Sequence, residues 1–325
     1  MVIERCGQKD GETWIEVTRS RGLWSRLATI LRIRSHIKRE NVSRVILTTA
    51  SGTYQWMFLS CLPYGVTSIG ILHYMHLLGT SVTQGRIEKK LDAYVVISPH
   101  VLEMPHQSPA IPIHVVPQNA RLVSSDIRVP NKGPDDVWIV VPGTVDMRRR
   151  AYEDLFCDEV LGRLPPNARV IVLGNAGKRS DPVRSGFYRM VDTYASRVTV
   201  FEEFMDHQSF HAWMSRADIV LPLLHPQTAE YQDFLTDKCS GAFSMAWAYG
   251  LPLLLENGFS RFTHLQHGTI FYDVKDLGRV LVDAVSTSTT FNDVRVQAQS
   301  PEIGDEMRLR ATLHVLETPH EPLLS

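Results

Sequence analysis

Short runs of aliphatic and β-branched residues alternate with helical segments along most of the chain. Residues 44–49, 91–98, 137–141 and 269–272 are examples of such runs, and an amphipathic segment at 23–39 precedes the first of them. Runs of this length and composition are typical of strands that are buried on both faces. Strands joined through helices form a parallel sheet, because each crossover brings the chain back to the same edge. The sequence therefore predicts an α/β protein with doubly wound sheets.

A polar segment at residues 121–136 interrupts this alternation. It contains Pro130, Gly133 and Pro134 and has the composition of a linker. A chain of 325 residues is also long enough for two domains. We therefore predict an N-terminal domain at residues 1–128 and a C-terminal domain at 129–325. Two such units place a cleft between them, and ligands of these sheets bind at the carboxyl ends of the strands.

Composition and charge exclude several classes of protein. The formal net charge is −1, which argues against a nucleic-acid partner for the molecule as a whole. The four cysteines are scattered, so neither a disulfide framework nor a zinc site is expected, and the chain fits a reducing compartment. The first residues are polar and lack the pattern of a signal peptide. We expect a cytoplasmic protein that uses no metal and no cofactor.

Two segments bear on membranes. Residues 54–78 approach the length of a membrane span, but Pro63 and Gly65 interrupt them, so we predict a helix, a turn and a strand instead. The segment 19–44 is strongly basic, and its central helix has apolar residues at helical spacing. Such a helix can lie on an anionic membrane surface, which would make the protein peripheral at the inner membrane face. A solvated outer face of a domain helix is the other interpretation.

The segment 237–256 carries a predicted anion site. We expect a helix that begins after Ser240 and Gly241 and ends at Gly250, followed by a buried strand. Backbone N–H groups at the start of a helix, with its dipole behind them, attract anions, and Lys238 adds a charge beside them. An ordinary capped helix would have the same sequence.

Further candidates follow other predicted strands. Arg148 and Arg149 come shortly after Gly143 at a strand end, and guanidinium groups bind phosphate bidentately. Asn175 lies in a glycine-containing turn that lets a ligand approach the backbone. Glu230 and Tyr231 lie in a polar loop and are candidates for ribose or sugar hydroxyls. Surface arginines, a plain turn and a solvated loop are the corresponding structural alternatives.

His73 and His76 follow a predicted strand of the first domain. A histidine at the carboxyl end of a strand can act as a base on a hydroxyl group or hold a sugar or phosphate. A histidine with a purely structural role is the alternative for each. We select His73 as the candidate catalytic residue.

The order of these features resembles the donor domain of GT-B glycosyltransferases, in particular the retaining glycosyltransferase family 4 of bacterial polysaccharide synthesis. The residues that carry the resemblance are Gly143 with Arg149, Gly174-Asn175, residues 201–221, and Ala246, Ala248 and Gly250-Leu251-Pro252. The resemblance covers roughly residues 137–285. It implies two Rossmann-like domains facing a cleft, and transfer of a hexosyl group from a nucleotide-diphosphate sugar to a saccharide or lipid-linked saccharide.

The predicted donor-binding residues are Gly143, Arg148, Arg149, Asn175, Glu230, Tyr231, Lys238, Ser240 and Gly241. The family pattern has two glutamates eight residues apart, whereas this chain has Asp237 and Met245 at the matching positions. Its first domain also looks short. Two other functions therefore stay open: a catalytically weak homologue that acts as partner or scaffold of an active glycosyltransferase, and a sugar-nucleotide epimerase with the same architecture.

Overall fold

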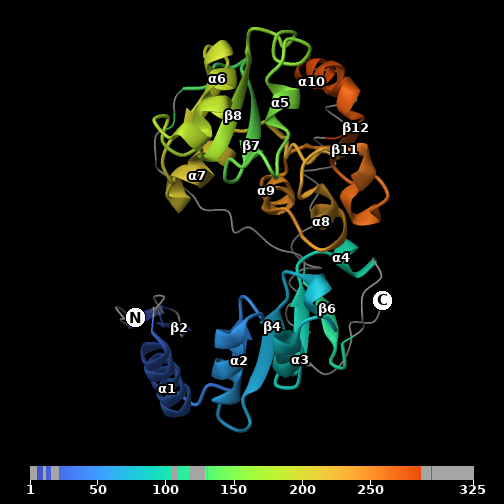
Figure 1. The fold of residues 1–325 in the computed structure, drawn as a ribbon. Coiled ribbons are helices and arrows are strands. Elements are labelled where there is room, and N and C mark those ends of the chain that lie inside the picture. Colours follow the sequence, from blue (N-terminus) through green and yellow to red (C-terminus); the bar gives the residue numbers. More distant parts are fainter. Residues whose placement is uncertain are drawn as a thin grey trace. The chain divides into compact units, whose positions relative to one another are not determined.

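The computed structural model describes residues 6–9, 12–15, 22–103, 109–116, 129, 131–286 and 294. Contacts between Cα atoms divide the chain into two units (Figure 1). Described residues up to 97 and from 109 to 116 form the first unit, and those at 98–103 and from 129 onward form the second. The domain boundary at 128/129 stays a prediction, since most of the predicted linker, like residues 19–21 of the basic segment, lies outside the described residues.

The second unit is built on a six-stranded parallel sheet with the order β12-β11-β10-β7-β8-β9. Its strands are β7 (Val137–Pro142), β8 (Ala168–Asn175), β9 (Val198–Phe201), β10 (Ile219–Val220), β11 (Leu253–Glu256) and β12 (Thr269–Tyr272). The chain starts in the middle at β7, adds β8 and β9 on one side, and then crosses to the other side for the remaining strands. This reversal makes the sheet doubly wound, and β7 and β10 are the neighbours at which it occurs.

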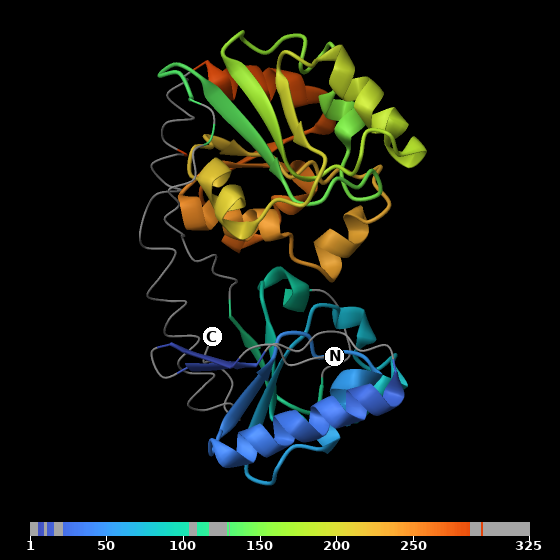
Figure 2. The same ribbon diagram turned by 90° about the vertical axis from the view of Figure 1, so that its left-hand side faces the viewer.

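Helices cover both faces of this sheet (Figure 2). They are α5 (Tyr152–Leu155), α6 (Ser185–Thr193), α7 (His207–Met214), α8 (Tyr231–Thr236), α9 (Gly241–Tyr249) and α10 (Leu277–Val285). Ile139 and Val141 of β7 pack with residues of α5, α6 and α10, whereas Trp138 and Val140 pack with residues of α7, α8 and α9. Successive side chains of a strand point to opposite faces. Two covered faces therefore require the continuous apolar run that the sequence has here.

The first unit contains a four-stranded parallel sheet with the strands in chain order. Its elements are β3 (Arg44–Leu47), β4 (Thr67–Ile71), β5 (Ala93–Val96), β6 (Ile113–Val115), α1 (Leu23–Arg39), α2 (Thr53–Ser60) and α3 (Val82–Glu88). Two short antiparallel strands, β1 (Cys6–Lys9) and β2 (Glu12–Ile15), precede α1. The predicted α/β class is thus confirmed in both units.

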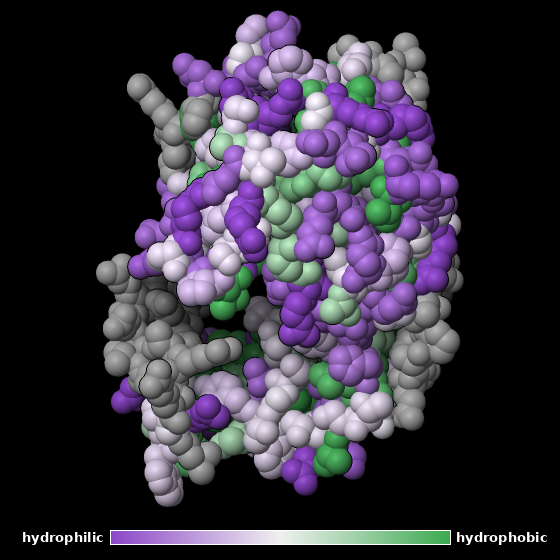
Figure 3. Space-filling model, turned by 45° about the horizontal axis from the view of Figure 1, so that its top comes forward, coloured by the Kyte–Doolittle hydropathy of each residue, from purple (hydrophilic) through white to green (hydrophobic). Residues whose placement is uncertain are grey.

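The segment 54–78 forms α2, a turn and β4, as predicted from its proline and glycine. Of the helices that the structure describes, none combines the length and the apolar character needed to cross a membrane. On the face of the molecule that Figure 3 shows, hydrophobic residues are interspersed with hydrophilic ones.

Candidate functional site

The loops that follow β7 and β10 lie at the point where the sheet reverses its order. β7 and β10 are hydrogen-bonded neighbours, with Ile139 opposite Ile219. The loop after β7 spans residues 143–151, and the loop after β10 spans 221–230. The first helices after these strands cover opposite faces of the sheet. Ligands of doubly wound sheets bind at the carboxyl ends of the strands, at such a reversal point.

Buried Arg150 joins the ends of these two strands. Its guanidinium group donates to the carbonyl oxygen of Pro142, and Nη1 lies 3.4 Å from the carbonyl oxygen of Pro222. The backbone N–H of Ala151 also donates to the carbonyl of Leu223, at 3.0 Å. Sequence reasoning selected the two arginines before Arg150 and gave this one no role. In the structure, the Arg150 side chain connects the two loops through these hydrogen bonds.

Two glycines let the loop after β7 approach β8. Gly143 has a φ angle of +106°, which residues with a side chain rarely adopt. A Cβ atom at Gly174 would lie 2.0 Å from the carbonyl oxygen of Gly143, so only glycine fits there. The side chain of Asn175 accepts the N–H of Gly177 through Oδ1, at 2.7 Å. This hydrogen bond stabilises a turn, which is the structural alternative that the sequence left open for Asn175.

Arg149 and Lys238 meet at one carboxylate. Arg149 Nε lies 3.0 Å and Lys238 Nζ 3.1 Å from the same atom, Oε2 of Glu230. Lys238 Nζ also lies 2.7 Å from Oδ2 of Asp233. The backbone N–H of Glu230 donates to the carbonyl of Arg148, at 3.1 Å, so main-chain and side-chain bonds both connect the two loops. We name Arg149, Glu230, Asp233 and Lys238 the charge cluster.

The pKa shifts of Glu230 and Lys238 both favour the ionised form. The side chains of Glu230 and Lys238 are only 18% and 16% exposed, against 40% for Arg149. Burial alone would raise the pKa of Glu230, but the hydrogen bonds and charges of Lys238 and Arg149 outweigh it and lower that pKa. Burial alone would lower the pKa of Lys238, but Asp233 and Glu230 raise it. The site thus holds two cations next to two carboxylates.

Other predicted residues lie near the charge cluster in the chain. Arg148 is exposed. Ser240 precedes α9 as its N-cap and accepts the N–H of Ala242 through Oγ, at 3.4 Å. Gly241 is exposed, with no atom within 4 Å of the position that a Cβ would take. The helix ends at Gly250 in the left-handed conformation, as predicted.

Tyr231 and His73 are not members of the charge cluster. Tyr231 is buried, and its hydroxyl group donates to the carboxylate of Glu256 at the end of β11. His73 belongs to the first unit, just beyond β4, where Nε2 lies 2.7 Å from the carbonyl oxygen of Thr48. Because a carbonyl only accepts, Nε2 carries the proton, and in neutral His73 the other nitrogen, Nδ1, is the basic one.

Sequence reasoning missed a histidine network that holds Lys238. Nε2 of His100, in α4 (His100–Glu103), lies 3.0 Å from the carbonyl oxygen of Lys238. Ser98 Oγ lies 2.7 Å from His100 Nδ1 and 3.2 Å from His264 Nε2, and the two imidazole rings stack. Burial lowers the pKa of both histidines, that of His264 to about 4. No local pattern marks these residues, which lie far apart in the sequence.

A second network of hydrogen-bonded side chains contains His225, in the loop after β10. His225 Nδ1 lies 2.5 Å from Oδ2 of Asp154, and His225 Nε2 lies 2.8 Å from the hydroxyl oxygen of Tyr272. The imidazole is fully buried, and burial lowers the pKa of His225 although Asp154 opposes this shift. The neutral ring donates to Asp154 and accepts from Tyr272. Neither histidine network was predicted from the sequence.

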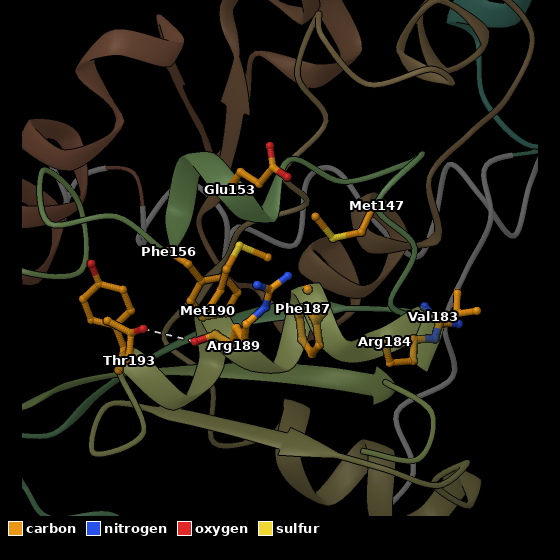
Figure 4. Close-up of a pocket in the computed structure, with 11 residues that line it drawn as sticks. Met147, Glu153, Phe156, Val183, Arg184, Phe187, Arg189, Met190 and Thr193 are labelled. Carbon is orange, nitrogen blue, oxygen red and sulfur yellow. Dashed lines mark hydrogen bonds between the residues drawn. The ribbon is translucent and has the colours of Figure 1, made fainter. Parts of the chain in front are cut away.

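A surface hollow of about 580 Å³ lies between α5 and α6 (Figure 4). Phe156 and Phe187 are among its apolar lining residues, and Glu153, Arg184 and Arg189 contribute charged groups. Arg184 also donates to the carbonyl of Val145, at 2.9 Å. None of the charge-cluster residues lines this hollow.

No protein-family model matches the sequence, and neither does any curated protein. Solved structures do match. One is a Listeria monocytogenes protein described as a UDP-N-acetylglucosamine 2-epimerase, with 14% identity and a TM-score of 0.62 over 95% of this chain and 85% of that one. A glycosyltransferase from Rickettsia africae has 12% identity and a TM-score of 0.58 over 93% of this chain and 83% of that one. An E. coli structure with bound UDP-2-fluoro glucose has 10% identity and a TM-score of 0.57 over 93% of this chain and 79% of that one. The two α/β units thus have the GT-B fold of these proteins.

Proposed function

We propose that the protein is a glycosyltransferase that takes a hexosyl group from a nucleotide-diphosphate sugar, as the resemblance to family 4 implies. The observation that supports this most is the meeting of Arg149 and Lys238 at the reversal point of the second sheet. Two cations held at that edge suit the two phosphates of such a donor. Solved structures of this fold include a glycosyltransferase and a complex with a UDP-sugar analogue, which makes UDP the first nucleotide to test.

The chemistry that we propose is electrostatic. As the bond between sugar and diphosphate breaks, negative charge grows on the leaving diphosphate, and fixed cations nearby lower the barrier. Arg149 and Lys238 would supply this charge, with Arg148 and the Ser240-Gly241 segment as further contacts, and we expect no metal requirement. The acceptor would be a saccharide or lipid-linked saccharide. His73, with Nδ1 as its basic nitrogen, is our proposal for the acceptor side.

Calorimetric titration with UDP tests the donor site. We expect Arg149→Ala and Lys238→Ala each to weaken UDP binding, on the order of ten- to a hundred-fold, because each removes a charge-assisted hydrogen bond. Arg279→Ala is the matched control, since Arg279 forms ion pairs with Asp276 and Asp283 beside and on α10. Equal affinity of all variants and the unchanged protein would contradict the assignment of this site.

A sugar-nucleotide epimerase is the second candidate, and two observations favour it. The Listeria protein described as a 2-epimerase has this fold. The carboxyl ends of β10 and β11 also hold groups for proton transfer, namely the buried His225 with its partner Asp154, and Glu256 with Tyr231. NMR spectra of the protein with UDP-N-acetylglucosamine and no acceptor separate the candidates: a new sugar epimer supports the epimerase. Binding of UDP without any turnover of UDP-sugars would favour the partner or scaffold role.

We further propose that α1 attaches the protein to an anionic membrane surface. Trp24 and Leu31 are 82% and 51% exposed and lie two helical turns apart, on one side of α1. Arg32, Lys38 and Arg39 are exposed on the same helix. Exposed apolar side chains between cations are typical of helices that bind anionic lipid. This location would suit an enzyme with a lipid-linked acceptor.

A further inference from the structure

The carboxylate of Glu230 lies between the two cations that the proposed donor site needs. Both Arg149 Nε and Lys238 Nζ reach Oε2 of Glu230, at 3.0 and 3.1 Å. In the structure these cations are therefore already paired with an anion of the protein itself. A diphosphate placed between both cations would compete with Glu230 for them, since Glu230 contacts Arg149 Nε and Lys238 Nζ.

The pairing is strong enough to matter for binding. Glu230 and Lys238 are largely shielded from water, so their attraction is screened less than that of a surface pair. Lys238 has a second carboxylate partner, Asp233, at 2.7 Å, whereas Arg149 also lies over the ring of Phe234, 5.8 Å from its centroid. Both cations thus keep contacts of their own when Glu230 moves, so its departure need not release them.

We propose that Glu230 is an internal counter-anion that occupies the diphosphate position until a donor displaces it. This inference rests on the proposed function and deepens it. Without a donor, Glu230 holds Arg149 and Lys238 in place. It also makes the site selective, because a ligand must replace the contacts of Glu230 with both cations. A diphosphate, with several charged oxygens, does so, whereas a single small anion replaces only part of them. Glu230 is therefore a specificity-determining residue of the proposed donor site.

Titration of the full chain with inorganic pyrophosphate, UDP and inorganic phosphate tests this inference. Glu230→Gln removes the competing charge and keeps the shape of the side chain. We expect it to bind pyrophosphate and UDP on the order of tenfold more tightly, and to gain affinity for phosphate by a larger factor, which reduces the selectivity for diphosphates. Asp192→Asn is the matched control. It removes one carboxylate from an exposed ion pair with Arg179 in the same unit and should leave all three affinities unchanged.

The possible outcomes separate the two proposals. Tighter binding by Glu230→Gln alone supports the counter-anion. Unchanged or weaker binding by a folded Glu230→Gln protein, checked by circular dichroism and repeated with Glu230→Ala, would overturn it, and UDP binding by the unchanged protein would leave the donor site standing. If Asp192→Asn binds the ligands more tightly to the same extent, the effect comes from the change in net charge, which would also overturn the inference. Failure of every variant to bind any of the three ligands would contradict both proposals.

Discussion

At the scale of single residues, Arg150 and Gly174 set the backbone geometry of the site. Arg150 fastens the ends of β7 and β10, and Gly174 lets the loop after β7 touch β8. Neither residue needs to contact a substrate to be essential for the position of Arg149. Substitutions at such positions should therefore reduce stability before they reduce binding.

Gly174→Ala should lower the free energy of unfolding by about 2–4 kcal/mol, because the new Cβ would lie 2.0 Å from a backbone oxygen that cannot rotate away. Gly186→Ala is the control. This glycine is exposed in α6 with open space around it, and alanine there should stabilise the helix by up to about 1 kcal/mol. Urea unfolding followed by circular dichroism measures both, and equal effects of the two substitutions would contradict this account of Gly174.

His264 should make the protein less stable in mild acid. Burial and the neighbouring His100 lower its pKa from 6.5 to about 4 in the folded state. Between these values the unfolded chain binds a proton that the folded protein does not, so stability falls as the pH drops from about 6.5 toward 4. Urea midpoints at pH 7.5 and 5.0 should therefore differ less for His264→Gln than for the unchanged protein. An identical difference would show that another group governs the acid response.

At the scale of elements, α1 has two distinct sides. Ile30 and Ile37 are buried, which explains the helical spacing of apolar residues in the sequence. Leu31 of the same apolar set is exposed, and so is Trp24. A helix needs only its inner side to pack on a domain. The exposed Trp24 and Leu31 are the residues on which the proposed membrane contact depends.

Trp24→Ser should reduce binding to vesicles that contain anionic lipid, because it removes the largest exposed apolar side chain of α1. The measurement is co-flotation with vesicles of phosphatidylcholine alone or with phosphatidylglycerol, at low and high salt. Tyr64→Ser is the control, since Tyr64 is a fully exposed aromatic residue outside α1. If the unchanged protein does not float with anionic vesicles, the membrane proposal is wrong.

At the scale of the whole molecule, the two units have different sheets. The second sheet reverses its strand order and places charged loops at the reversal, whereas the described strands of the first sheet follow in chain order. The proposed donor residues all belong to the second unit, and His73 belongs to the first. Binding of donor and of acceptor should therefore affect separate parts of the chain.

Hydrogen exchange with and without UDP tests this division. We expect slower exchange in the segments 143–150 and 226–241 of the second unit, because bound diphosphate would order both loops. Exchange in α2 and α3 of the first unit should stay unchanged, which provides the internal control. Protection confined to the first unit would contradict the placement of the donor.

The sequence predicted the elements well where burial alone decides them. The strand Thr269–Tyr272 and the helix Leu23–Arg39 match their predicted bounds, because their apolar spacing reflects one or two packed faces. The helices α3 and α8 were missed because they are short and their apolar pattern is weak. The sequence of residues 152–161 predicts a helix over that whole segment, but the helix ends at Leu155, since Phe156 leaves the helical conformation.

The candidate site was predictable only in part. Charged residues after strands, such as Arg149 and Lys238, can be found from the chain because strand ends meet at one edge of a sheet. Their shared contact with Glu230 could not be found, since it depends on α8 and on how two loops fold over the reversal point. His100 could not be linked to Lys238 either, because nothing local relates a helix at residue 100 to a carbonyl at 238.

The hydrogen bond from the backbone N–H of Glu230 to the carbonyl of Arg148 fixes the position of the Glu230 backbone while its side chain can rotate. Exchange of its carboxylate for an incoming anion then needs rotation about side-chain bonds alone and no loop opening. Rotamer changes of this kind take place far faster than the microsecond-to-millisecond motions of lids. We therefore expect ligand association to be limited by diffusion and charge, with a single kinetic phase even at high ligand concentration.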